Sequence, residues 1–430
     1  MIITVVGMGK IGLPLAVQYA RKGHRVLGVD INPGVVDQIN AGLEPFPGEA
    51  HLGEYLTDVV RQGLLTATVD TQTAVAQSVA VVIVVPLVVD TEATPDFTAM
   101  DAATRAVGSG LRDGTLVSFE TTVPVGTTRT RLAPLLAQVS SLVPERDFHV
   151  VFSPERVLTG RVFNDLRRYP KLVGGLSPAG ERAGCAFYES VLDFNPRSDL
   201  PRPNGVWAMG SAEAAELAKL AETTYRDVNI ALANQFAVFA ESAGIDVHRV
   251  IEACNSQPYS HIHQPGIAVG GHCIPVYPRL YLWNDPTATV VQAARMANAE
   301  MPNRAIQRLE GFMGPLSGLN VTILGAAYRG GVKETAFSGV WDLVQLLHDR
   351  GAQVFVHDPL YKDAELAAMG LAAFHRGDRT DAVILHTDHA EYREWRSSDT
   401  PGARVIVDGR RILEAQHWPG VKLLTIGTAD

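Results

Sequence analysis

Three glycines near the start of the chain have the spacing of a phosphate-binding turn. The segment Gly7–Gly12 reads Gly-Met-Gly-Lys-Ile-Gly, a G-x-G-x-x-G pattern. With 39 glycines in 430 residues, such a pattern arises by chance about 0.3 times per chain, so its surroundings must decide. In this turn the first glycine permits a tight bend, the second lets a pyrophosphate approach the backbone, and the third lets a helix pack against a strand. The amide groups and the dipole of the helix N-terminus then favour the phosphates.

The sequence around the turn is typical of a dinucleotide-binding unit. The apolar run Ile2–Val6 precedes it, a helical pattern over Leu13–Arg21 follows, and a second apolar run, Arg25–Val29, ends at Asp30. Asp30 is placed to accept hydrogen bonds from ribose hydroxyls and to repel a 2′-phosphate, which favours NAD over NADP. We therefore predict an NAD site; the alternative is a glycine turn in an α/β domain without a cofactor. The expected cofactor contacts are Gly7, Gly9, Lys10, Ile11, Gly12, Asp30, Pro86 and Thr121.

One cysteine stands in a setting that suits a nucleophile. Cys273 belongs to the segment Gly270–Pro275, which reads Gly-Gly-His-Cys-Ile-Pro. Its glycines allow a close approach of the backbone. The cysteine is also far from the glycine turn in sequence, as expected of a residue brought into a cleft between domains. The alternative is a small buried apolar residue without chemistry.

Alternating apolar runs and helical patterns must position these residues. Continuous apolar runs separated by helices are typical of a parallel sheet covered on both faces. Two groups of such runs stand near the two ends of the chain. The segment Gly210–Gly244 between these groups has a long helical pattern, with Ser211 as the expected N-cap and Gly244 as the expected end of the helix. The predicted fold class is α/β, with two Rossmann-like parallel-sheet domains joined by this long central helical segment. The expected strands are Ile2–Val6, Arg25–Val29, Val81–Val85, Thr115–Phe119, Asn320–Leu324, Gln353–His357, Ala382–His386 and Arg404–Val407.

The composition excludes several classes of protein. Apolar residues make up 46% and charged residues 19% of the chain, which argues against disorder, collagen and coiled coils. A formal charge of −9 gives no overall bias toward nucleic acid or anionic membranes. Three widely spaced cysteines, Cys185, Cys254 and Cys273, and an N-terminus without a signal peptide point to a cytoplasmic protein. The apolar run Val79–Val89 is too short to span a bilayer. We also expect no metal site.

Several motifs resemble those of one family, the UDP-glucose/GDP-mannose dehydrogenases. The segment Gly270–Pro275 is most similar to the branch that acts on UDP-N-acetyl-hexosamines, which carries a GGHC motif. The resemblance implies an NAD-binding Rossmann domain over residues 1–200, a helical central and dimerisation domain over 201–310, and a C-terminal sugar-nucleotide-binding domain over 311–430. It also implies a homodimer and a sugar-nucleotide substrate. The other matching segments are Gly7–Pro14, Thr121–Thr127, Ser153–Arg156, Ala215–Lys219, Tyr225–Ala231 and Val407–Arg410.

The resemblance also implies a chemistry. Family members oxidise a sugar hydroxymethyl group to a carboxylate with two NAD, through an aldehyde, a thiohemiacetal and a thioester. By position, Cys273 would be the nucleophile, and Lys219 would contact the substrate and stabilise the developing oxyanion. Glu155 would act as base in thioester hydrolysis, with Thr121 helping to place the water. The covalent step keeps the aldehyde from escaping between the two hydride transfers.

The chain departs from the family at positions of the expected site. One helical turn after Lys219 the family has an asparagine, where this chain has Thr223. Four residues after the cysteine it has an aspartate, where this chain has Tyr277, and a phenol is a poor base at neutral pH. An arginine that reaches the sugar nucleotide is replaced by Ala336, and a Pro-Gly before the cysteine by Ile267-Ala268.

These departures leave two other hypotheses open. In the first, the enzyme is a redox-neutral dehydratase that oxidises a hydroxyl on the sugar of a nucleoside or nucleotide sugar, eliminates water and returns the hydride. Lys219, Glu155 or Tyr277 would then move protons, and Cys273 would be dispensable. In the second, the chain is a non-catalytic member that binds NAD or a nucleotide as a regulator.

Three basic residues are candidates for the phosphates of a substrate. Arg329 and Lys333 lie on the Gly330-Gly331 loop after an expected strand, where positive charge suits a nucleotide. A solvated pair of charges is the alternative for these two. Arg410 has the stronger claim because it lies in a family-like segment.

Overall fold

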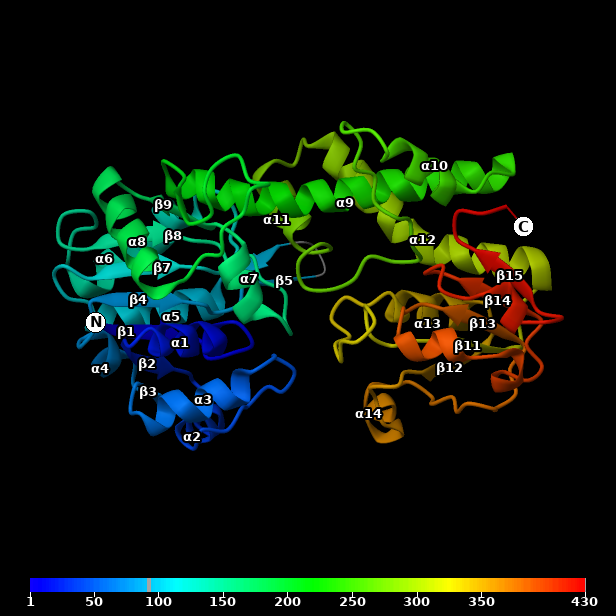
Figure 1. Ribbon diagram of the computed structural model, residues 1–430, viewed down its shortest axis with the longest axis horizontal. Helices are drawn as coiled ribbons and strands as arrows, with labels where there is room; N and C mark the ends of the chain where they lie inside the picture. The colour runs from blue at the N-terminus through cyan, green and yellow to red at the C-terminus, as the bar shows by residue number, and fades with distance from the viewer. Residues whose placement is uncertain (91–93, 430) are drawn as a thin grey trace. The chain divides into compact units, whose positions relative to one another are not determined.

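Short β-branched segments alternate with helices along the chain and form the strands of two sheets (Figure 1). The computed structural model describes residues 1–90 and 94–429, and it divides into two units, Met1–Ala221 and Glu222–Asp430.

The first unit contains a sheet in the order β10-β9-β8-β7-β4-β1-β2-β3. The strand order reverses between β1 and β4, so the loops after these two strands diverge at the carboxyl edge of the sheet, where α/β proteins bind their ligands. A separate antiparallel pair is formed by β5 (Val88–Val89) and β6 (Pro95–Asp96). The strands of the large sheet are β1 (Ile2–Val6), β2 (Arg25–Val29), β3 (Leu65–Thr68), β4 (Ala80–Ile83), β7 (Leu116–Phe119), β8 (His149–Phe152), β9 (Lys171–Gly175) and β10 (Val206–Ala208).

Apolar side chains cover both faces of this sheet. Neighbouring residues of β1 point to opposite faces, and Val5 and Val6 accordingly belong to two different core clusters. Both faces therefore need helices, which explains the nearly continuous apolar strands. The helices are α1 (Gly12–Arg21), α2 (Pro33–Asn40), α3 (Leu52–Arg61), α4 (Thr71–Val75), α5 (Thr98–Gly110), α6 (Ala133–Ser140), α7 (Val162–Arg168) and α8 (Pro178–Val191), with a π-helical turn at Thr128–Leu132.

Two strands, β9 and β10, run against the rest, because β10 is parallel to β9 and β9 is antiparallel to β8. The sequence predicted parallel strands, but β9 pairs antiparallel with β8, with Phe152 opposite Gly174 and Val151 opposite Gly175. The start of β9 therefore lies at the carboxyl edge of the sheet. Continuing the register by three residues places Lys171 opposite Glu155.

The expected central helix is α9 (Ala212–Ala243), which crosses the boundary of the two units. Ser211 Oγ accepts a hydrogen bond from Ala214 N at 3.1 Å, as an N-cap does. Gly244 follows the helix in the left-handed conformation, with φ of +72°, which ends it. Three further helices are α10 (Val247–Cys254), α11 (Tyr277–Asn284) and α12 (Thr289–Met313).

The second unit contains a five-stranded parallel sheet in the order β12-β11-β13-β14-β15. Its strands and helices are β11 (Asn320–Leu324), β12 (Gln353–His357), β13 (Ala382–Leu385), β14 (Val405–Asp408), β15 (Lys422–Thr425), α13 (Val340–Asp349) and α14 (Asp363–Ala368), with 3₁₀ turns at Ala390–Glu394, Ser397–Asp399 and Ala415–His417. The predicted fold class, two Rossmann-like sheets and a long central helix, is confirmed. Among the described residues, none of the helices combines the length and the apolar character needed to cross a membrane.

Candidate active site

The glycine turn between β1 and α1 has the shape of a phosphate cradle. Gly7 has φ of +93°, and its amide donates to Val29 O at 2.8 Å. A Cβ on Gly12 would lie 1.9 Å from Gly7 O, whereas a Cβ on Gly9 would meet nothing within 4 Å. The turn is thus closed at Gly12 and open at Gly9, where a phosphate must approach. Within the described chain, no side chain caps α1, and the N-terminus of a helix favours an anion.

Asp30 stands at the end of β2 with its carboxylate fixed beside the turn. Its Oδ2 accepts from Met8 N and its Oδ1 from Asn32 N, both at 2.9 Å. Each oxygen keeps a lone pair for a ribose hydroxyl. The turn and this carboxylate together fit the pyrophosphate and ribose of NAD.

The loops after β4 and β7 lie at the same edge of the sheet. A Cβ on Gly7 would lie 2.9 Å from Val84 O, and Thr121 Oγ1 donates to Val85 O at 2.7 Å. Exposed Pro86 follows directly. Thr121 and Pro86 are therefore brought beside the glycine turn, and of the two remaining expected contacts, Lys10 is exposed and Ile11 packs partly against the core.

Glu155 takes part in a buried cluster that the sequence did not reveal. Lys171 Nζ donates to Glu155 Oε2 at 2.8 Å and to Glu120 Oε2 at 2.7 Å. The other oxygen of Glu155 accepts from Arg156 N at 2.7 Å. Tyr188 and Tyr19 donate to Glu120 Oε1 at 2.7 and 3.3 Å. Glu120 stands next to Thr121 in sequence, but nothing in the sequence pointed to Lys171.

The two carboxylates of this cluster differ in pKa, although both contact the same lysine. Burial raises the pKa of Glu120 to about 7, although Lys171 opposes the shift. Burial also acts on Glu155, but there Lys171 and the Arg156 amide outweigh it and hold the pKa below its ordinary value. The pKa of Lys171 is lowered by burial and raised more strongly by the two carboxylates, so it ends above its ordinary value. Glu155 is thus the ionised carboxylate of the pair at neutral pH.

A second buried glutamate fixes the part of α9 that carries Lys219. Glu216 accepts from Gly126 N at 2.6 Å, from Thr128 N at 2.9 Å and from Thr128 Oγ1 at 2.6 Å. Burial raises the pKa of Glu216 to about 7. Lys219 is itself buried and lies one turn further on the same face of the helix. Glu216 belongs to a family-like segment, but its contact with the loop after β7 was missed.

In the second unit, the Cys273 loop lies against the segment that follows β11. Gly271 N donates to Ala336 O at 3.0 Å, and a Cβ on Gly270 would lie 2.6 Å from the Tyr328 Cβ. Tyr277 begins α11, and its amide donates to Cys273 O at 2.9 Å. Half-buried Cys273 and the divergent positions 277 and 336 are therefore brought together.

Asparagines of the central helices fix the segment that leads to this loop. Asn234 Oδ1 accepts from Gly266 N, and Asn234 Nδ2 donates to Asn298 Oδ1, both at 2.9 Å. Asn298 in turn donates to Asp227 Oδ1 at 2.7 Å, and Arg295 donates to the same oxygen at 2.6 Å. The sequence singled out none of these residues for this role.

The basic candidates differ in their surroundings. Arg410 Nε donates to His386 O at 2.7 Å and its Nη2 to Tyr328 O at 3.4 Å. Arg329 follows Tyr328, and its buried Nε has no hydrogen-bond partner among the described residues. Lys333 pairs with Glu365 of α14 at 2.6 Å. Arg329 and Arg410 thus lie near the cysteine loop, whereas Lys333 is engaged elsewhere.

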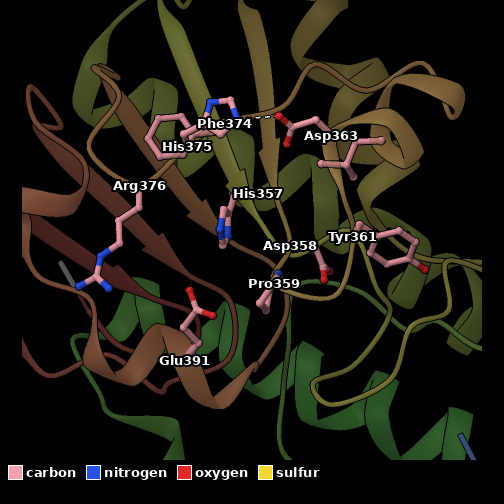
Figure 2. Close-up of a pocket in the computed structure, with 10 residues that line it drawn as sticks. His357, Asp358, Pro359, Tyr361, Asp363, Phe374, His375, Arg376 and Glu391 are labelled. Atoms are coloured by element: carbon pink, nitrogen blue, oxygen red, sulfur yellow. Dashed lines mark hydrogen bonds and ion pairs between the residues drawn. The ribbon is translucent and has the colours of Figure 1, made fainter.

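A cavity of about 310 Å³ opens beside the carboxyl end of β12. Figure 2 shows Arg376 and Glu391 on one side of His357, with Asp363 and Tyr361 on the other. Asp363 is paired with His375 at 2.9 Å, and Arg376 with Asp399 at 2.8 Å. No predicted site residue lines this cavity.

Comparisons with known proteins cover the whole chain. Models of the UDP-glucose/GDP-mannose dehydrogenase family match it in three parts: the NAD binding domain at residues 1–192, the central domain at 213–303 and the UDP binding domain at 322–415. UDP-N-acetyl-D-mannosamine dehydrogenase of Pyrococcus horikoshii is 33% identical, with 96% of each chain covered. NDP-N-acetyl-D-galactosaminuronic acid dehydrogenase of Ralstonia nicotianae is 32% identical, with 96% of this chain and 97% of the relative covered.

Solved structures of nucleotide-sugar dehydrogenases have the same fold as this chain. The Pyrococcus horikoshii UDP-D-ManNAc dehydrogenase superposes with a TM-score of 0.87 at 31% identity, with 99% of each chain covered. A UDP-glucose dehydrogenase from Pyrobaculum islandicum gives 0.88 at 27% identity, with 100% of this chain and 98% of the other covered. The predictions of an enzyme and of NAD as its cofactor are confirmed. The chain belongs to the UDP-glucose/GDP-mannose dehydrogenase family.

Proposed function

We propose that this enzyme oxidises the C6 hydroxymethyl group of a UDP-N-acetyl-hexosamine to the uronic acid with two NAD. The contact of Gly271 N with Ala336 O carries this proposal. It joins the loop of Cys273 to the segment matched by the UDP binding domain, so a sugar linked to UDP would be held near the thiol. The names of the relatives from Pyrococcus and Ralstonia both contain an N-acetyl-hexosamine or its uronic acid.

In this mechanism NAD, when bound, accepts one hydride in each of two oxidations. A base of the chain takes the hydroxyl proton as the alcohol becomes an aldehyde, and the Cys273 thiol then adds to the carbonyl carbon. Lys219 stabilises the negative oxygen of the adduct, which is oxidised to a thioester. Glu155 takes a proton from the attacking water, held by Thr121, and the thiolate leaves. In total, one alcohol and one water give a carboxylate, two NADH and three protons.

A redox-neutral dehydratase is the second candidate, and the divergent positions favour it. Ala336 occupies the place of an expected substrate-binding arginine directly against the cysteine loop. Tyr277, whose amide bonds to Cys273 O, offers a phenol in place of a carboxylate. Both changes fall at the loop on which net oxidation depends.

The ratio of NADH formed to substrate consumed separates these candidates. UDP-hexoses, UDP-N-acetyl-hexosamines and free nucleosides would be offered, and the product mass recorded. Two NADH and an acid support the proposal, and Cys273→Ser should then stop acid formation. Turnover without net NADH, with a product lighter by one water and an active Cys273→Ser variant, would establish the dehydratase. No turnover on any substrate would favour a non-catalytic nucleotide-binding protein.

We also infer that the enzyme is a homodimer formed through α9. Large apolar side chains remain exposed on this helix, among them Tyr225, Leu232, Phe236 and Phe239. Exposed apolar stripes of this kind mark contact surfaces. Sedimentation velocity should give twice the chain mass, and Phe239→Glu, which places a charge in the stripe, should give monomers. A wild-type monomer at micromolar concentration would contradict the inference.

A further inference from the structure

A buried lysine bridges two carboxylates at the edge of the first unit's sheet. We propose that Lys171 is the positioning residue for Glu155, whose carboxylate it holds in place and ionised, and that Glu120 anchors Lys171. This inference rests on the proposed function, in which Glu155 is the base of thioester hydrolysis. It adds to that function a residue 16 positions away from Glu155 in the sequence.

The direction of β9 makes this contact possible. Since β9 is antiparallel to β8, its first residue reaches back over the carboxyl end of β8, from which Glu155 projects. The Lys171 side chain is only 4% exposed. Its ammonium group contacts Glu155 at 2.8 Å, Glu120 at 2.7 Å and the Tyr188 ring at 4.8 Å from the centroid. An ammonium with this set of neighbours has little freedom to move.

The Glu155 carboxylate is held at both of its oxygens. Lys171 binds Oε2, and the Arg156 amide binds Oε1 at 2.7 Å. Two contacts on different oxygens fix the plane of the carboxylate as well as its position. Glu155 and Lys171 also line a cavity of about 10 Å³, which is room for one water.

The charged and titratable groups around the pair come from β7, α8, α1 and α7, and from the segments after β8 and before β9. Behind Lys171, Glu120 at the end of β7 accepts from Tyr188 of α8 and Tyr19 of α1. The pKa values of both phenols are raised by burial and by Glu120, so they remain hydrogen-bond donors.

On the other side, Asp165 of α7 and Tyr169 line the small cavity. Asp165 is paired with Arg161 at 2.7 Å. Lys171 is therefore the cation that Glu155 and Glu120 share. Because burial raises the pKa of Glu120 to about 7 while that of Glu155 is held low, the first proton taken up by the pair resides on Glu120. Glu155 is left free to accept one from water.

Paired substitutions separate positioning from a purely structural role. Lys171→Met keeps the apolar stem and removes the charge, whereas Lys171→Arg keeps the charge. In Lys171→Met we expect the rate of acid formation at pH 7 to fall about 100-fold, with the KM for NAD changed less than twofold. The enzyme should release a burst of two NADH per active site and accumulate a thioester on Cys273, detected by intact-protein mass spectrometry. Lys171→Arg should restore the rate to within about tenfold of wild type, with no accumulation.

The dependence of kcat on pH should shift in a direction that the structure predicts. Without the cation, the Glu155 carboxylate is harder to ionise, so the acidic limb of the kcat profile should move up by at least one pH unit in Lys171→Met. Because Glu120 takes up its proton before Glu155 does, the uncharged Glu120→Gln side chain should leave the limb where it is in wild type. Lys22→Met, which breaks the exposed Lys22–Asp193 pair of the same unit, is the matched control and should move neither the limb nor the burst. A slow Lys171→Met enzyme with no burst and an unmoved limb would overturn the inference. If Lys171→Met fails to fold, the same result in Lys171→Met/Glu120→Gln, which leaves fewer buried carboxylates unpaired, would overturn it.

Failure of the proposed function looks different. If wild-type enzyme forms no NADH from any nucleotide sugar, the proposed function is wrong. The pairing of Lys171 with Glu155 is then tested by unfolding the protein without substrate. The urea midpoint of Lys171→Met should then recover toward wild type between pH 8 and pH 5.5, as the unpaired carboxylates take up protons. Adding Glu155→Gln to Lys171→Met should reduce this recovery. An equal recovery with and without Glu155 would overturn the pairing.

Discussion

Replacing either of two glycines of the turn by alanine should weaken NAD binding, but only one of the two substitutions should destabilise the fold. In Gly9→Ala the new Cβ meets no protein atom within 4 Å, so the unfolding free energy should change by less than about 0.5 kcal/mol. The methyl group would occupy the space through which a phosphate approaches the backbone. In Gly12→Ala the new Cβ would lie 1.9 Å from Gly7 O, and this backbone oxygen cannot rotate away. The turn itself must therefore move.

The magnitudes follow from what each methyl group displaces. Gly9→Ala should lose one hydrogen bond between an amide and a charged phosphate, which contributes about 1.5–3 kcal/mol. At 1.4 kcal/mol per tenfold change, the Kd for NAD should rise by about 10- to 100-fold. Gly12→Ala should lower the unfolding free energy by at least about 3 kcal/mol, at the upper end of overpacking costs, and lose NAD binding as well.

Calorimetric titration with NAD and urea unfolding of the same samples check both expectations. Gly63→Ala, at a left-handed position with open space around it, measures what a strained alanine costs away from the site. Gly9→Ala with wild-type affinity would refute the placement of the pyrophosphate. Gly12→Ala with wild-type stability would refute the close approach of helix and turn.

Three further predictions concern single side chains. Asp30→Asn should reduce the preference for NAD over NADP at least about tenfold, because the amide no longer repels a 2′-phosphate; an unchanged ratio of the two Kd values would contradict it. Glu216→Ala should lower the unfolding free energy by about 3–5 kcal/mol, since it leaves the buried donors of Gly126 and Thr128 unpaired, and Glu216→Gln should cost less; equal urea midpoints would be inconsistent with this. Burial lowers the pKa of His386 to about 3, below its value near 6.5 in the unfolded chain. Stability is therefore lost as the pH falls below 6.5, by about 1.4 kcal/mol between pH 7.5 and pH 5.5, and urea unfolding of His386→Asn should lack this loss.

The sequence by itself determined the local structure of the glycine turn and the place of Asp30 beside it. The strand Ile2–Val6, the glycine turn, α1 and Asp30 follow one another within 30 residues, so local patterns were enough to place them. The long helix and its ends at Ser211 and Gly244 were predictable for the same reason. The expected strand Val81–Val85 proved shorter, because β4 ends at Ile83 and Val85 O instead accepts from Thr121.

Tertiary structure alone decided how the charged groups pair. Residue types along the chain do not reveal the direction of a strand, and only the antiparallel course of β9 brings Lys171 to Glu155 and Glu120. Lys333 likewise has the charge expected of a phosphate ligand, but folding places it against Glu365, 32 residues away. Local order arises from contacts between near neighbours, whereas buried charges take partners that depend on strand direction and register.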